Sequence, residues 1–193
     1  MTVLCLLAFA FTMHAGPVTP VEVQTSDAVT KVTFFSPEIV RVVKVPAGKP
    51  GNTRESLVVT MEPQDVKVQK SENSSYVTLK SSALTVKIDK KTGLVQFLAK
   101  GKNLLKEKSY GFEERTSGPD AGSFRTTIVY QLDKDEPIYG IGVTQDGKLN
   151  HRGSSHFLEQ NNTQDYQHVI QSIKGWGLFW DNYSRANFDD NEE

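Results

Sequence analysis

The chain is a succession of short segments rich in Val, Ile, Phe and Thr, and this pattern most constrains its fold. Turn-forming residues separate the segments, and no stretch of helix length carries an apolar stripe with a period of 3.6 residues. Closing two sheets on each other buries alternating apolar faces. The pattern therefore predicts an all-β fold, an antiparallel β-sandwich, with strands at 29–35, 39–45, 57–61, 66–69, 76–79, 84–88, 94–98, 124–132, 138–143, 169–173 and 177–180.

The clearest local element is a β-hairpin in the first half of the chain. Leu84, Val86 and Ile88 alternate with polar residues, 89–93 is a turn sequence, and 94–98 returns. The glycine that ends this turn is suited to a positive φ. By contrast, the polar, glycine-rich stretch from 110 to 122 predicts an exposed loop.

The N-terminus differs from the rest of the chain. Residues 3–11 form an apolar run that is too short to span a bilayer, and small residues follow it at Ala15 and Gly16. We interpret residues 1–15 as a secretory signal peptide and 16–193 as the folded domain, which predicts an exported protein without a membrane span. Cys5, the only cysteine, would leave with the signal, so the mature domain has no disulfide.

Size and charge narrow the class of protein. A chain of 193 residues is long enough for one domain with a substantial core. Its 22 Lys and Arg balance 23 Asp and Glu, which gives a net charge of −1. The basic footprint of a nucleic-acid-binding protein is missing, so no nucleic-acid partner is expected.

Sequence motifs for catalysis are also missing. The string Gly140-Ile141-Gly142 begins like a dinucleotide-binding loop, but Gln145 stands where the third glycine would be and no helical pattern follows. The nucleophile elbow, the zinc-protease motif and the phosphate-binding loop are absent from the sequence. We therefore predict no catalytic residue and no cofactor.

The histidines and the acidic tail are candidate site residues. His151, His156 and His168 are spaced by five and twelve residues, which fits no common zinc pattern, so no metal site is predicted. A glycosidase needs two carboxylates that face one bond. The acidic residues at 189–193 are interpreted instead as a solvated turn.

The segment from 136 onward is dense in Gly, Trp, Tyr and Asn and is the most informative part of the sequence. Trp176 and Trp180 have the same parity along an extended strand, so they either point into the core or stack on a sugar. Tyr139, between glycine-rich neighbours, is expected to pack. The polar loop at 161–165 is the best candidate for binding, because polar loops on rigid sandwiches usually carry the binding residues.

These motifs carry a resemblance to a known family. The strings I-Y-G-I-G (138–142), G-K-L-N-H-R-G (147–153), L-E-Q-N-N-T (158–163) and K-G-W-G-L-F-W-D-N (174–182) occur in that order. Together with 34–41 and 82–93, they resemble the N-terminal β-sandwich of glycoside hydrolase family 31. The likeness covers about residues 20–190.

The resemblance implies a galactose-mutarotase-like supersandwich from a secreted retaining α-glycosidase that acts on α-glucosides or α-xylosides. In the family, the catalytic aspartates lie on a (β/α)8 barrel that follows the sandwich, so this domain is expected to be inactive alone and incomplete at its C-terminal end. In the family, a loop of the sandwich forms part of the rim of the substrate pocket. That loop matches Asn161, Asn162, Thr163, Gln164 and Asp165.

Two other functions remain open from the sequence. A free-standing carbohydrate-binding module would present exposed aromatic side chains as a flat platform. A structural or adhesive surface domain would have no role in sugar binding. The exposure of the two tryptophans separates the first of these from a domain that docks on a catalytic barrel.

Overall fold

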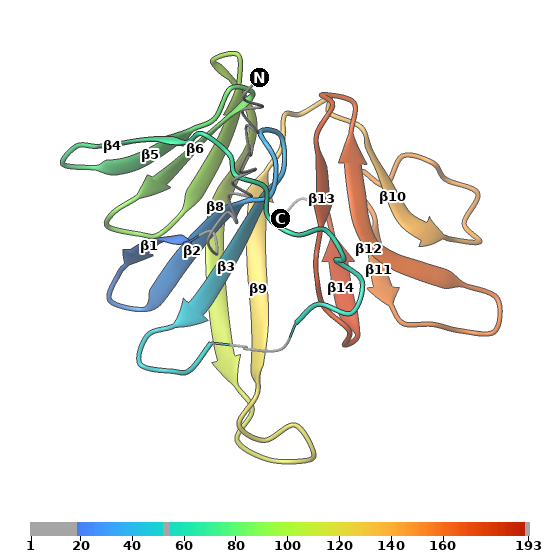
Figure 1. Cartoon of the computed structure of the whole chain (residues 1–193). Helices are drawn as coiled ribbons and strands as arrows, with labels where there is room; N and C mark the ends of the chain where they lie inside the picture. The colour runs from blue at the N-terminus through green and yellow to red at the C-terminus, as the bar shows by residue number, and fades with distance from the viewer. Residues whose placement is uncertain (1–18, 52–54, 192–193) are drawn as a thin grey trace, which may run out of the picture.

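The computed structural model describes residues 19–51 and 55–191, and all regular secondary structure in these ranges is β-strand (Figure 1). The expected signal peptide at 1–15 lies outside the described residues. No helix in the described part is long and apolar enough to cross a membrane. The strands are β1 (Val21–Gln24), β2 (Ala28–Phe34), β3 (Val40–Pro46), β4 (Gln69–Glu72), β5 (Tyr76–Lys80), β6 (Leu84–Asp89), β7 (Val95–Ala99), β8 (Lys102–Glu114), β9 (Phe124–Gln131), β10 (Ile138–Val143), β11 (Ser155–Leu158), β12 (Asp165–Ser172), β13 (Gly177–Phe179) and β14 (Ala186–Asp189).

The strands form four antiparallel sheets. A six-stranded meander runs in the order β4-β5-β6-β7-β8-β9, and a three-stranded sheet has the order β1-β2-β3. The C-terminal part forms the sheet β10-β12-β13 and the pair β11-β14. Figure 1 shows the C-terminal sheets beside the edge of the meander formed by β8 and β9. The predicted all-β antiparallel sandwich is therefore confirmed.

The main core lies between the β1-β2-β3 sheet and the meander. Every second residue of β2 and β6 is buried, which is the pattern of strands with one face on a core. A second, smaller core joins β8 to the C-terminal sheet through Leu105, Ile138 and Trp176. The buried residues of the main core are Val23, Val32, Phe34, Val77, Leu79, Leu84, Val86, Ile88 and Val95.

The predicted hairpin is confirmed as β6–β7. The backbone amide of Gly93 donates to the carbonyl of Asp89, while Asp89 Oδ1 accepts the amides of Lys91 and Thr92. Gly93 has φ 70°, and a Cβ there would lie 3.0 Å from Thr30 Oγ1 on β2. Glycine is required here both by its φ and by the close approach of the opposite sheet.

A buried ion pair joins the two layers at this turn. Lys44 Nζ of β3 lies 3.0 Å from Glu107 Oε2 of β8, with the two side chains 3% and 1% exposed. Lys44 also donates to the Gly93 carbonyl at 2.6 Å, and Glu107 accepts the Val95 amide at 2.8 Å. The Lys44 ammonium lies 4.6 Å from the centre of the Tyr110 ring. Both charges are thus hydrogen-bonded, as burial requires.

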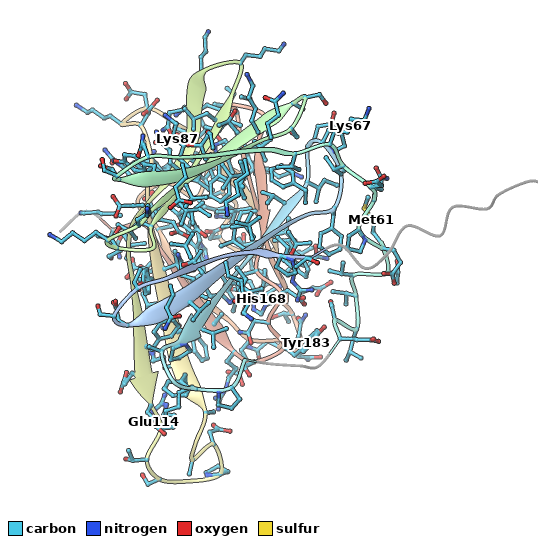
Figure 2. The ribbon with its side chains drawn as sticks, turned by 60° about the vertical axis from the view of Figure 1, so that its left-hand side comes forward. Met61, Lys67, Lys87, Glu114, His168 and Tyr183 are labelled. Carbon is cyan, nitrogen blue, oxygen red and sulfur yellow. The ribbon has the colours of Figure 1, made fainter. Side chains whose placement is uncertain are left out.

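The connection between β3 and β4 spans the two halves of the molecule. Figure 2 shows Met61 and Lys67 along this connection, on the same side of the molecule as Tyr183. The Tyr183 hydroxyl accepts the Leu57 amide, and Ser56 donates to Asp181 at 3.0 Å. These contacts tie the chain between the sheets to the residues that follow β13.

Several strand predictions were wrong. Residues 57–61 form no strand, and the strand predicted at 66–69 begins only at 69. The predicted loop at 110–122 begins after 114, because the polar strand β8 continues to that point by pairing with β9. No strand was predicted at β11 or β14, which pair with each other and have half of their residues exposed.

The buried ion pair makes a testable prediction. Lys44→Met should lower the free energy of unfolding by roughly 3–5 kcal/mol, because it leaves the Glu107 carboxylate buried without its cation. Lys31→Met is the matched control, since Lys31 pairs with Glu22 at 2.6 Å at the exposed surface and should cost at most about 1 kcal/mol. Urea denaturation measures both. Equal effects of the two substitutions would contradict the role assigned to the pair.

Candidate functional site

The predicted binding loop lies at the surface between β11 and β12. Its residues are exposed except Gln164, which is half-buried, and Asp165 begins β12. Backbone bonds between Asn161 and Gln164 close the loop into a tight turn. The Gln160 side chain braces the turn, because its amide donates to Asp165 Oδ1 at 2.9 Å and accepts the Tyr166 amide at 3.1 Å. The backbone of the loop is therefore fixed on both sides.

The polar side chains of this loop differ in their hydrogen bonding. Among the described residues, the side chains of Asn161, Asn162, Thr163 and Gln164 make no hydrogen bond, whereas Asp165 is engaged by Gln160. Amide and hydroxyl groups both donate and accept, as sugar hydroxyls do. An ordered backbone with unpaired polar side chains is suited to hydrogen-bonding a polyol.

The strand beside the loop contains a bulge that requires its glycines. The pairing of β10 with β12 shifts register between Gly140 and Gly142, which have φ 115° and 92°. A Cβ at either position would lie 2.4 Å or less from a backbone oxygen of β12. The string that resembled the start of a nucleotide loop is therefore a β-bulge. Ile141 is buried by it, while Tyr139, expected to pack, is 37% exposed.

Trp176 is part of a buried polar network around Glu136. Its indole Nε1 donates to Glu136 Oε1 at 2.9 Å, and the same oxygen accepts the hydroxyl of Ser172. The other oxygen, Oε2, accepts the Asp133 amide at 3.1 Å and lies 2.9 Å from Lys174 Nζ. Trp176 is 9% exposed. Of the two roles open from the sequence, core packing or stacking on a sugar, the structure therefore supports core packing for Trp176.

The pKa of Glu136 reflects this network. Burial alone would raise the pKa of this carboxyl, but hydrogen bonds from Ser172, Lys174, the Asp133 amide and Trp176 lower it below the ordinary value of 4.5. The folded state therefore holds the ionised form.

A cavity with a volume of about 1820 Å³ is lined by residues from both halves of the molecule. Trp180 is half-buried and lines it, together with three acidic residues. Two of these are already paired: Glu107 with Lys44, and Asp181 with Arg41 at 3.0 Å. The Glu107 side chain is 1% exposed and that of Asp181 is 17% exposed.

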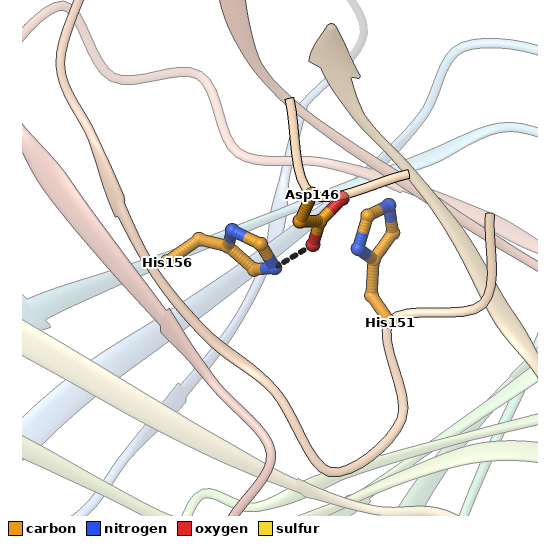
Figure 3. A group of neighbouring side chains, drawn as sticks. All are labelled: Asp146, His151 and His156. Atoms are coloured by element: carbon orange, nitrogen blue, oxygen red, sulfur yellow. Dashed lines mark ion pairs between the residues drawn. The ribbon is translucent and has the colours of Figure 1, made fainter. Parts of the chain in front are cut away.

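A second cluster lies beside the binding loop. Figure 3 shows the Asp146 carboxylate between the rings of His151 and His156. One ligand atom from each of the three lies within 4.8 Å of the others. The prediction of no metal site rested on the spacing of the histidines and on the polar loop around them, and it left out Asp146. The sequence gives no signal for this grouping, because a loop and a strand bring the residues together.

The pKa values in this cluster are shifted. Burial lowers the pKa of His151, as does the nearby His156, while the Asp146 carboxylate and the backbone of Gly140 act in the opposite direction. The Thr144 hydroxyl and the Lys148 amide lower the pKa of Asp146. The cluster therefore favours a neutral His151 and an ionised Asp146 at neutral pH.

The acidic tail is more ordered than the sequence indicated. Asp189 ends β14 and accepts a hydrogen bond from Ser155 at 2.7 Å. Asp190 accepts the Gly153 amide at 2.9 Å and pairs with Arg152. Arg152 also donates to two backbone carbonyls, at Asp133 and Glu136. At least as far as Asp190, the tail holds the loop after β10 in place rather than forming a solvated turn.

The fold is an antiparallel β-sandwich with a bulged strand and a polar loop in its C-terminal half. The family described as the glycosyl hydrolase 31 N-terminal galactose mutarotase-like domain matches residues 29–189. The chain belongs to this family, as the sequence motifs had indicated.

Comparison with individual proteins agrees with this assignment. An alpha-xylosidase of Saccharolobus solfataricus is 30% identical over 170 residues, which is 80% of this chain and 22% of that protein. The crystal structure of a GH31 alpha-xylosidase from Xanthomonas citri superposes with a TM-score of 0.79 at 28% identity, over 88% of this chain and 19% of that one. A xylosidase from Aspergillus niger shares the fold, with a TM-score of 0.70, 18% identity and coverage of 90% and 27%. The chain thus spans about a fifth to a quarter of the length of these relatives.

The Glu136 network predicts a pH dependence. A carboxyl whose pKa is lowered by folding stabilises the native state above its ordinary pKa, and this stabilisation is lost as the pH falls through the folded value. Glu136→Gln should therefore destabilise the fold by roughly 1–3 kcal/mol at neutral pH and reduce the loss of stability below pH 4.5.

Urea denaturation at pH values on both sides of 4.5 measures this effect. Glu62→Gln, at an exposed position of the β3–β4 connection, is the matched control and should leave the pH profile unchanged. A Glu136→Gln profile parallel to that of the unmodified chain would contradict the assignment.

Proposed function

We propose that this chain is a non-catalytic N-terminal domain of a retaining α-glycosidase, and that the loop at 161–165 forms part of the substrate pocket of a catalytic barrel in the same protein. The observation that carries the proposal is the fixed loop backbone, whose four polar side chains have no hydrogen-bond partner among the described residues. Such groups can bind sugar hydroxyls with little loss of conformational freedom.

The proposed substrates are α-xylosides or α-glucosides. Proteins named as alpha-xylosidases are similar to this chain in both sequence and structure, and the matching segment of a Pseudescherichia vulneris protein named as a family 31 glucosidase is 34% identical over 61 residues. A retaining mechanism needs two carboxyl groups about 5–5.5 Å apart. The proposal assigns them to the barrel, since the paired carboxylates in the large cavity are engaged by Lys44 and Arg41.

The burial of Trp176 disfavours the free-standing carbohydrate-binding module. Such a module would expose both tryptophans on a flat platform, whereas Trp176 is buried and hydrogen-bonded and Trp180 is half-buried in the cavity. The two tryptophans therefore form no exposed flat platform. The polar loop remains as the surface for sugar.

The proposal includes export of the protein. It rests on the apolar run at 3–11 and the small residues after it, which are typical of a signal peptide. N-terminal sequencing of the protein recovered outside the cytoplasm should show that the mature chain begins at Gly16. A chain that retains residues 1–15 there would contradict it.

The loop assignment predicts an effect on catalysis. In the enzyme formed by this chain and its catalytic barrel, Asn162→Ala should lower kcat/KM for an aryl α-xyloside or α-glucoside roughly tenfold, because one hydrogen bond in a pocket contributes about 1.4 kcal/mol. Thermal unfolding should be unchanged, since the Asn162 side chain has no bonded partner in the described structure.

Asn187→Ala is the matched control, because Asn187 is an exposed asparagine on β14 outside the loop. It should leave kcat/KM unchanged. The 193-residue chain alone should show no turnover. Equal kcat/KM for Asn162→Ala and the unmodified enzyme would exclude Asn162 from the pocket, and turnover by the chain alone would refute the assignment of catalysis to the barrel.

A further inference from the structure

We propose that Asp146, His151 and His156 form a binding site for one divalent transition-metal ion, with Zn²⁺ as the ion that fits best. The three side chains come from the loop after β10 and from β11, and Figure 3 shows them converging with the carboxylate in the middle. One ligand atom from each lies within 4.8 Å of the others. His156 Nε2 is 3.7 Å from Asp146 Oδ2.

An unsatisfied nitrogen in the cluster points independently to a ligand. His151 is 3% exposed, and its Nδ1 is buried without a hydrogen-bond partner in the described structure. Buried polar atoms are almost always paired, so an orphan of this kind needs an explanation. A metal ion bound to Nδ1 supplies one.

The kinds of ligand select the ion. Two imidazoles and a carboxylate are typical ligands of Zn²⁺ and its neighbours, whereas Ca²⁺ and Mg²⁺ prefer oxygen ligands alone. Tetrahedral ligands at about 2.0–2.1 Å from Zn²⁺ lie about 3.4 Å from one another. Ligand atoms as far apart as 4.8 Å therefore need to approach by about 1.4 Å on binding the ion. One or more positions on the ion remain for water.

The surrounding residues hold the ligands in place. Asp146 Oδ1 accepts hydrogen bonds from the Thr144 hydroxyl at 2.7 Å and the Lys148 amide at 3.1 Å, which leaves Oδ2 for the ion. The His151 amide donates to the Ile138 carbonyl at 2.8 Å. The rings of His151 and His156 meet edge to face with their centres 5.1 Å apart. Hydrogen bonds that fix a carboxylate ligand raise metal affinity.

The cluster is physically connected to the binding loop. Gln145, next to Asp146 in the chain, donates its side-chain amide to the Thr163 carbonyl at 2.9 Å. The ring of Tyr166, at the start of β12, lies with its centre 6.4 Å from that of His156. An ion at the cluster would restrain the backbone of both segments. Metal binding itself does not depend on the function proposed for the loop.

Titration of ZnCl2 into the chelator-treated 193-residue chain, followed by calorimetry, tests the site. We expect one ion per chain, and the visible d–d bands of four- or five-coordinate Co²⁺ when CoCl2 replaces zinc. Asp146→Asn and His156→Gln should each weaken affinity by at least about tenfold. Asp146 is exposed, so its variant should fold even if substitution of the buried His151 does not.

Asp120→Asn is the matched control, since it makes the same change at an exposed position in the β8–β9 loop and should bind zinc as the unmodified chain does. No heat and no cobalt spectrum, or equal affinity in Asp146→Asn and Asp120→Asn, would overturn the proposal. Zinc should also shift the amide NMR signals of Gln145 and Thr163. If the histidine signals shift and these two do not, the connection to the loop is overturned while the site stands.

Discussion

The fold depends on one buried interaction, the ion pair between Lys44 and Glu107, because it joins the two layers of the main sandwich. Burial raises the pKa of Glu107 and lowers that of Lys44, and each partner's charge acts against that shift. Two buried charges offset their desolvation only with good geometry and further hydrogen bonds. Here the turn at Gly93 supplies a carbonyl and the start of β7 an amide. The pair therefore fixes how the hairpin lies on the β1-β2-β3 sheet.

Glu136 has a comparable role in the C-terminal half. Its carboxylate accepts hydrogen bonds from the indole of Trp176, a serine hydroxyl and a backbone amide, and it pairs with an ammonium group. These groups lie where β10, β12 and β13 meet. Arg152 binds the carbonyl of the same residue and connects it to Asp190. These polar groups are placed by a packed core on one side and by the glycine bulge of β10 on the other. The loops that follow β10 are therefore held in a defined position.

The two sites proposed for this domain share that scaffold. The loop at 161–165 offers unpaired polar side chains, and the cluster of Asp146, His151 and His156 offers metal ligands, with Gln145 as the direct bond between them. The loop is mostly exposed, whereas His151 of the cluster is buried. The domain thus combines ordered sheets with polar groups in the loops that connect their strands.

Local chemistry in the sequence determined the all-β class, the β6–β7 hairpin and the family, because alternation, turn residues and short motifs act over neighbouring positions. It also indicated the loop at 161–165 as a binding loop. The role of each side chain in that loop is part of the proposal. Only the tertiary structure decided that Trp176 packs against Glu136, that the polar strand β8 extends to 114, and that Asp146 meets His151 and His156. These depend on strand register and on contacts between distant segments. No local pattern encodes them, because each is set by how the sheets pack.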